Sequence, residues 1–155
     1  MLVEARHLAT LRPAMGALAV TTSRIHFNNE SAKQKRRVLD AIAEMPVQVF
    51  ATVCRKDHDV DEYRARAGCV AEIVRRTQEL RVTNLILESR QDDREDVRVI
   101  TRVRRPCPVL RFEHRPGRQE RMLWAADAVT WAVAAGSAWV CRLGAVLTDV
   151  VEVRP

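Results

Sequence analysis

Two carboxylates stand at the edges of predicted elements, where side chains of an α/β protein can reach a ligand. Glu88 closes the apolar segment TNLILE (residues 83–88), and open α/β sheets usually bind ligands at the carboxyl ends of their strands. Glu30 comes one residue before the predicted start of a helix. Each acid also has an ordinary interpretation: Glu88 could be the first polar residue of a loop, and Glu30 could compensate the helix dipole.

Asp127 is the most informative acid because its helical neighbours are mostly apolar. Residues three and four positions away on a helix share one face, and for Asp127 these are Leu123, Trp124, Thr130 and Trp131. We therefore expect Asp127 on a buried face, where an ionised carboxylate needs an arginine, a metal, backbone donors or a sheet edge as its partner. A structural ion pair and a functional role both remain open.

The histidines form no recognisable metal motif. His26, His58 and His114 lie in separate segments and lack the i, i+4 spacing of a helical zinc pair. His114 follows the strand residues Phe112 and Glu113, so it could lie near a sheet end as a proton shuttle or phosphate contact. An ordinary surface histidine is the alternative. The common phosphate-binding and nucleophile loops, GxxxxGK[ST], GxGxxG and GxSxG, do not occur.

Basic and acidic residues fall into adjoining zones of the sequence. Residues 98–121 hold eight arginines and two acids, whereas residues 88–96 hold five acids and two arginines. Such zones could place a phosphate-binding ridge beside an acidic metal pocket, as a metal-dependent nuclease requires, although solvated helix faces also produce charge runs. The arginines that we predict to contact nucleic acid are Arg104, Arg105, Arg115, Arg118 and Arg121.

The overall charge favours anionic partners. The chain has a net charge of +6 and an isoelectric point near 9.8, which suits nucleic acid or phosphorylated ligands. Lysine is rare among the 26 basic residues, so the codon bias of a GC-rich genome explains the arginines equally well.

Length and composition indicate one globular domain over residues 1–155. The chain is as long as a typical domain, and 47% hydrophobic with 30% charged residues argues against disorder. No apolar run approaches the roughly 20 residues of a membrane span, and no signal peptide is recognised. The four cysteines are scattered without a CxxC pair, so we expect reduced thiols and a cytoplasmic location.

Helix-like and strand-like segments alternate along the chain, which predicts an α/β fold. Ser31 and Gln34 form a capping box at the start of the second predicted helix. The inner stripe of the third should hold Tyr63, Ala67, Val70 and Val74. We expect helices over residues 7–20, 31–44, 59–80, 92–104 and 119–135, and strands over 47–53, 83–88, 109–113 and 145–153, with a short strand or extended turn over 24–27. Whether the last strand joins the sheet is open.

The order of short motifs resembles a known family. His26-Phe27, Glu30-Ser31, LILE (85–88), FEH (112–114) and LWAADAV (123–129) follow one another as in the bacterial family called domain of unknown function 3800, which is assigned to the ribonuclease H-like fold. The resemblance covers roughly residues 5–140. It implies a mixed sheet flanked by helices, with acids around one or two Mg²⁺ or Mn²⁺ ions for phosphodiester hydrolysis.

The resemblance also implies roles for individual residues. Glu30, Glu88 and Asp127 would be the metal-binding and catalytic acids, with His114 nearby. Members of the family usually begin with a strand ending in Asp-Glu-Ser that supplies a central aspartate, and nothing before Glu30 matches it. We therefore expect the N-terminal strand to be missing here, either because it is encoded upstream of Met1 or because it has been lost together with much of the catalytic capacity.

Two other classes of function remain open. The arginine-rich zone alone would suit a non-catalytic nucleic-acid-binding module, with salt-sensitive binding and no cleavage. Trp131, Trp139 and the apolar C-terminal tail would suit an interaction or homo-oligomerisation domain that adds a strand to a partner's sheet.

Overall fold

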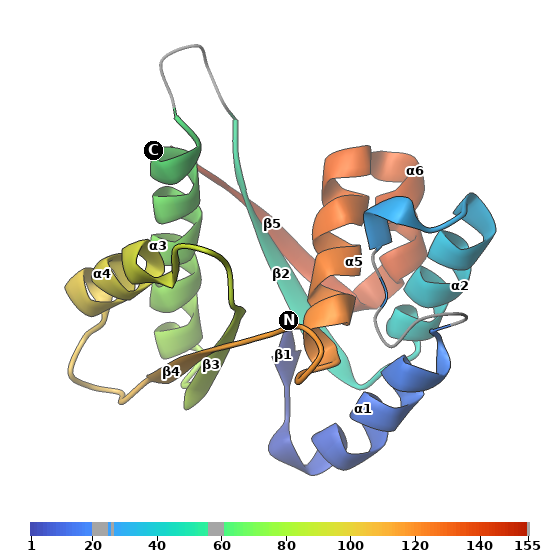
Figure 1. Ribbon diagram of the computed structural model, residues 1–155, viewed down its shortest axis with the longest axis horizontal. Coiled ribbons are helices and arrows are strands. Elements are labelled where there is room, and N and C mark those ends of the chain that lie inside the picture. Colours follow the sequence, from blue (N-terminus) through green and yellow to red (C-terminus); the bar gives the residue numbers. More distant parts are fainter. Residues whose placement is uncertain (20–24, 26, 56–60, 155) are drawn as a thin grey trace. The chain divides into compact units, whose positions relative to one another are not determined.

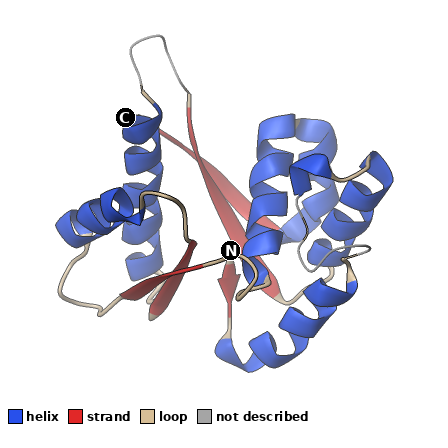
Figure 2. Ribbon diagram, viewed as in Figure 1, coloured by secondary structure: helices blue, strands red, loops and turns tan. Residues whose placement is uncertain are grey.

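Helices and strands alternate in the computed structural model, which describes all residues except 20–24, 26, 56–60 and 155 (Figures 1 and 2). The predicted α/β class is therefore confirmed. The chain divides into two compact units, and each is described by itself. Unit 1 comprises Met1–Ala51 and Gly117–Val150, and unit 2 comprises Thr52–Pro116 and Val151–Pro155. The single domain expected over residues 1–155 stays a prediction.

A three-stranded sheet, in the order β1-β2-β5, contains strands from both ends of the sequence. The short strand β1 (Leu2–Val3) pairs antiparallel with β2 (Val47–Cys54). On the other side of β2 lies β5 (Leu147–Val153), where the Thr148 hydroxyl donates a hydrogen bond to the Val49 carbonyl at 3.0 Å. The C-terminal strand thus joins the sheet, which the sequence left open.

The core of unit 1 is built mainly by three helices. These are α1 (Leu8–Ala17), α2 (Ala32–Ala43) and α5 (Met122–Ala135). The capping box predicted for α2 is half formed, because the Ser31 hydroxyl accepts a hydrogen bond from the Gln34 amide. The most deeply buried large side chains of this core include Met15, Phe27, Val38, Leu39 and Ile42.

Short helical segments complete unit 1. A 3-10 turn, Phe27–Asn29, follows the undescribed residues, while α6 (Ser137–Val140) and the 3-10 segment Cys141–Val146 connect α5 to β5. Another 3-10 turn, Ala5–His7, leads into α1. Of the short strand or extended turn predicted over residues 24–27, Arg24 and His26 lie outside the described residues. Ile25 belongs to no strand, and Phe27 begins a 3-10 turn.

Unit 2 contains a β-α-β arrangement preceded by a long helix. Helix α3 (Glu62–Glu79) leads to β3 (Asn84–Glu88), and α4 (Asp93–Val103) connects β3 to β4 (Arg111–Arg115). The two strands are parallel, with Leu87 opposite His114 and Glu88 opposite Arg115. Val70 and Val74 of α3 form a core with Ile100 and Leu110. This packing fixes the carboxyl ends of β3 and β4 next to one another.

One side chain of the predicted inner stripe of α3 is misplaced. Val70 and Val74 are buried as expected, but Tyr63 is 67% exposed. Tyr63 lies in the first turn of α3, where Ala65 is the buried residue instead. At this end of the helix the buried face passes through Ala65, which the predicted spacing did not show.

Two further findings concern the helices and the cysteines. None of the helices that the structure describes combines the length and apolarity needed to span a bilayer. All four cysteines are free, as the scattered spacing predicts.

Candidate functional site

Polar side chains gather at the carboxyl ends of the parallel strands β3 and β4 in unit 2. Side chains alternate between the two faces of a strand. Leu87 and His114, which are opposite one another in register, belong to the face on which α3 and α4 pack, and Glu88 and Arg115 belong to the other face. Glu88 and His114 therefore reach the same edge of the strand pair on opposite faces.

The face toward α3 and α4 carries a connected group of polar residues, which we call the His114 cluster: Arg66, Ser89, Asp93, Asp96 and His114. Asp96 is its buried centre, with a side chain 5% exposed. The Arg66 guanidinium holds both Asp96 carboxylate oxygens, at 2.9 Å through Nε and 2.5 Å through a terminal nitrogen. His114 Nε2 lies 3.4 Å from Asp96 Oδ2 and 4.0 Å from Asp93 Oδ1.

The second carboxylate of the cluster is also held by donors. The Arg90 amide and the Ser89 hydroxyl each donate to Asp93 at 2.7 Å. These hydrogen bonds, first that of the Arg90 amide and then that of the Ser89 hydroxyl, lower the pKa of Asp93 below its ordinary value. Asp93 thus stays ionised at neutral pH, and two carboxylates face the ring of His114.

His114 is not the surface residue that the ordinary interpretation of the sequence gave. Its side chain is only 11% exposed, because β4 is covered by α4 through the apolar residues Ile100 and Phe112. His114 lies between the buried carboxylate of Asp96 and the half-buried carboxylate of Asp93, and it ties α4 to β4. Arg66 ties α3 to α4 in the same way.

The spacing of apolar residues in the sequence could have identified Asp96 as a buried acid. Asp96 is one of the five acids of the acidic zone, residues 88–96. Val99, Ile100 and Val103 follow it at i+3, i+4 and i+7, so Asp96 occupies the apolar stripe of α4. An acid in such a stripe requires a partner, and Arg66, thirty residues earlier, could not be identified from spacing.

Glu88 is half-buried at the end of β3, on the face away from α3 and α4. Its register partner, Arg115, forms a 2.6 Å ion pair with Glu113. The Ser89 amide donates to the Arg115 carbonyl at 2.9 Å, which continues the strand pairing beyond Glu88. The expected position of Glu88 at a strand end is confirmed.

The expectation for Asp127 is wrong. Asp127 is exposed, whereas the buried face of α5 contains Ala125, Ala128, Val129 and Ala132. Helix α5 is apolar around nearly its whole circumference, so its sequence pattern did not specify which side faces the core. The carboxylate of Asp127 therefore does not lie in the core.

Glu30 lies where the sequence placed it, just before α2. It is half-buried, and its amide donates to the Phe27 carbonyl at 3.2 Å. Glu30 and Asp127 belong to unit 1, whereas Glu88 and His114 belong to unit 2. Their union in one pocket stays a prediction.

The residues that the structure describes include no group of three or more histidine, cysteine, aspartate or glutamate side chains that could hold a metal ion. In the His114 cluster, Asp96 is already bound by Arg66, so a cation there would have to displace a guanidinium. The cluster is therefore an ion network rather than a metal site. His26 and His58 lie outside the described residues.

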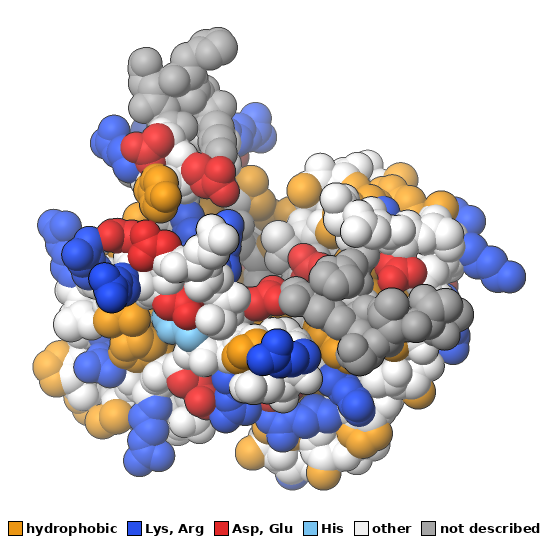
Figure 3. All heavy atoms as spheres, in the orientation of Figure 1, with side chains coloured by type: hydrophobic (Ala, Val, Ile, Leu, Met, Phe, Trp, Pro, Cys, Tyr) orange, Lys and Arg blue, Asp and Glu red, His pale blue; other side chains and the backbone are white. Residues whose placement is uncertain are grey.

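The arginines predicted to contact nucleic acid differ in their accessibility. Arg104, Arg105, Arg118 and Arg121 are exposed, whereas Arg115 is half-buried and paired with Glu113. Arg104 and Arg121 also lie over aromatic rings, those of Phe112 and Trp124 respectively. Basic and acidic side chains are interspersed on the face drawn in Figure 3.

No protein-family model matches the chain, and comparisons with curated proteins and with solved structures gave no match either. The resemblance to domain of unknown function 3800 accordingly stays a prediction.

Proposed function

We propose that this protein acts on nucleic acid as a divalent-metal-dependent nuclease or related phosphodiesterase, with a ribonuclease H-like fold. The observation that carries the proposal is the position of Glu88 at the carboxyl end of one of two parallel strands, with Arg115 opposite it in register. This edge is where α/β proteins most often bind ligands. An acid next to an arginine suits a phosphodiester, whose charge the arginine can contact.

The proposed acids are Glu88, Glu30 and Asp127, as the family resemblance implies. Mg²⁺ or Mn²⁺ bound by such carboxylates would supply charge stabilisation and an activated water. The exposure of Asp127 supports this role, because a carboxylate must be accessible to meet a ligand. The cytoplasmic location and the possible homo-oligomer belong to the same proposal.

For His114 we propose a positioning role. The His114 cluster anchors the end of β4, and Arg115 is the next residue of that strand. Substitution of His114 should therefore shift the carboxyl end of β4, and with it Arg115, without removing any of the proposed acids.

The test is cleavage of end-labelled single-stranded DNA, duplex DNA and RNA by the purified protein with Mg²⁺ or Mn²⁺. We expect cleavage that stops when the metal is chelated, and a loss of about 100-fold or more in Glu88→Gln. Glu79→Gln is the matched control, because Glu79 is an exposed glutamate at the end of α3. Equal activity of the two variants would refute the role of Glu88.

A second candidate function is nucleic-acid binding without cleavage. It is favoured by the exposure of Arg104, Arg105, Arg118 and Arg121. Binding of the same nucleic acids should weaken steeply as salt rises, since each phosphate contact releases counterions. Binding without cleavage at any metal concentration would replace the first candidate by the second. Absence of binding at low salt would eliminate both.

A further inference from the structure

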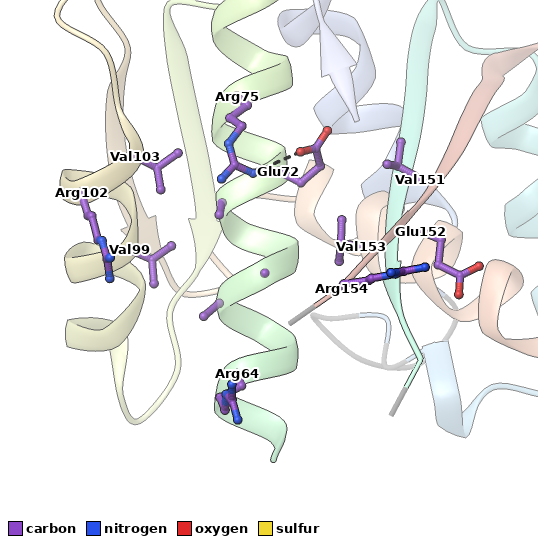
Figure 4. A pocket seen from close by; sticks show the side chains of 13 residues that line it. Arg64, Glu72, Arg75, Val99, Arg102, Val103, Val151, Glu152, Val153 and Arg154 are labelled. Atoms are coloured by element: carbon purple, nitrogen blue, oxygen red, sulfur yellow. Dashed lines mark hydrogen bonds and ion pairs between the residues drawn. The ribbon is translucent and has the colours of Figure 1, made fainter. Parts of the chain in front are cut away.

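A groove of about 660 Å³ runs along α3 in unit 2 (Figure 4). Its floor is made of small residues on one stripe of α3, and its walls are valines on α4 and on the end of β5. These residues are Ala67, Gly68 and Ala71 on the floor, Val99 and Val103 on α4, and Val151 and Val153 on β5. The floor and the walls of the groove are therefore apolar.

Arginines surround this apolar lining. Arg64 and Arg75 stand on α3, Arg102 on α4 and Arg154 at the end of β5 (Figure 4). The groove has two lining acids, and both have arginine partners: Glu72 pairs with Arg75 at 3.3 Å, and Glu152 pairs with Arg55 at 3.0 Å.

The positive charge at the groove is therefore not neutralised. Arg64, Arg102 and Arg154 are exposed, and within the described residues none of their guanidinium groups takes part in an ion pair. The rim complements an acidic occupant, because opposite charges across an interface favour encounter and orientation.

The dimensions of the groove select the kind of occupant. On α3 its lining extends from Arg64 to Arg75, which corresponds to about 16 Å, or three helical turns, at the rise of an α-helix. A floor of alanine and glycine lets a second helix approach closely, since the distance between packed helices is set by the side chains between them. The valine walls can accept the apolar anchors of an amphipathic helix.

The same lining disfavours a nucleic-acid strand. Single-stranded nucleic acid is bound by aromatic platforms and phosphate contacts, and the described residues that line the groove include no aromatic side chain. A nucleic-acid strand in the groove would place its phosphates against the valine side chains and would bury no apolar group of its own.

We propose that this groove docks an acidic amphipathic helix of a partner protein. The helix lays its apolar stripe between the valines of α4 and β5, and its acidic flanks meet Arg64, Arg102 and Arg154. This binding surface is separate from the proposed phosphodiester site, because it is formed by α3, α4 and β5 and includes neither Glu88 nor Arg115.

The test uses a fluorescein-labelled synthetic peptide of about 15 residues, with leucines at helical positions i, i+3, i+4 and i+7 and glutamates on the remaining faces. Binding to the full chain is followed by fluorescence anisotropy. The control is a peptide of identical composition in which the leucines are spread around the helix. We expect saturable binding of the amphipathic peptide and at least about tenfold weaker binding of the control. Equal binding of the two peptides would overturn the proposal.

Two variants locate the binding site, and a third is the control. Arg102→Glu should weaken peptide binding about tenfold, whereas Arg94→Glu, the same charge change on the exposed side of α4, should leave it within about twofold. Ala67→Leu exchanges one strong helix former for another and fills the floor, so it should also weaken binding. Circular dichroism establishes that each variant is folded.

A single-stranded oligonucleotide with the same label is the competing probe. If it binds and its affinity falls in Ala67→Leu, while the acidic peptide does not bind, the groove is a nucleic-acid site and the proposal is wrong. If the peptide binds and neither Arg102→Glu nor Ala67→Leu affects it, the peptide binds elsewhere and the proposal fails as well.

Discussion

Removal of the Asp96 carboxylate should be among the most damaging single changes in unit 2. Asp96 has a side chain 5% exposed, and it accepts two hydrogen bonds from Arg66 and faces His114. Asp96→Ala leaves the arginine and the histidine without the carboxylate that holds them. It also removes the polar contacts that Asp96 makes from α4 to α3 and β4.

The loss of stability expected for Asp96→Ala follows from the burial of its ion pair with Arg66. Breaking a buried ion pair by removing one partner costs about 3–5 kcal/mol when the other charge stays buried. The Arg66 side chain is 35% exposed and can regain part of its hydration. We therefore expect a loss of about 2–3 kcal/mol in the free energy of unfolding, or about 5–10 °C in the melting temperature.

The matched control is Glu95→Ala. Glu95 lies beside Asp96 in the first turn of α4 and pairs with Arg98 at the surface. Its removal costs the same favourable interaction with the helix dipole but no buried pair. The expected loss is at most about 0.5–1 kcal/mol.

Urea unfolding followed by far-ultraviolet circular dichroism measures both losses. Trp124, Trp131 and Trp139 are the three tryptophans of the chain, and all belong to unit 1. Tryptophan fluorescence therefore shows separately whether a change in unit 2 is transmitted to unit 1. The double variant Asp96→Ala with Arg66→Ala should reveal a coupling of about 1–2 kcal/mol. A loss in Asp96→Ala no larger than that in Glu95→Ala would refute the reasoning.

Three further predictions concern local features of the two units. Asp61→Ala removes the N-cap of α3, where the carboxylate accepts the Arg64 amide at 2.7 Å, and should cost about 1 kcal/mol in thermal unfolding. The pKa of Asp93 is lowered in the fold, chiefly by the hydrogen bond from the Arg90 amide. Ionised Asp93 therefore stabilises the folded protein at pH values above the pKa of the unfolded chain, which is near 3.8. The stability difference between the wild type and Asp93→Asn should be full at neutral pH and disappear as pH falls through the folded-state pKa, and a pH-independent difference would contradict this. Gly136→Ala should cost about 1 kcal/mol in chemical denaturation, because Gly136 has φ +104° although its added Cβ would meet no atom within 4 Å; an unchanged stability would argue against the strain.

Local patterns determined most of the elements before any contact was known. The strands predicted over residues 47–53 and 83–88 match β2 and β3 at nearly their observed bounds. The capping box at Ser31 correctly predicted the start of α2, whose side chains Val38, Leu39 and Ile42 are buried. These features depend on neighbours within one or two turns, so the sequence carries them directly.

Only the tertiary structure decided which polar residues belong together. Arg66 and Asp96 meet across thirty residues because α3 and α4 pack on the same side of the β3/β4 pair, and no spacing rule encodes that distance. Asp127 shows the converse: a nearly all-apolar helix leaves its orientation to the surrounding core, which turned this acid outward. The local sequence determines which residues share one face of a helix or strand. Whether that face is buried depends on the elements that pack against it.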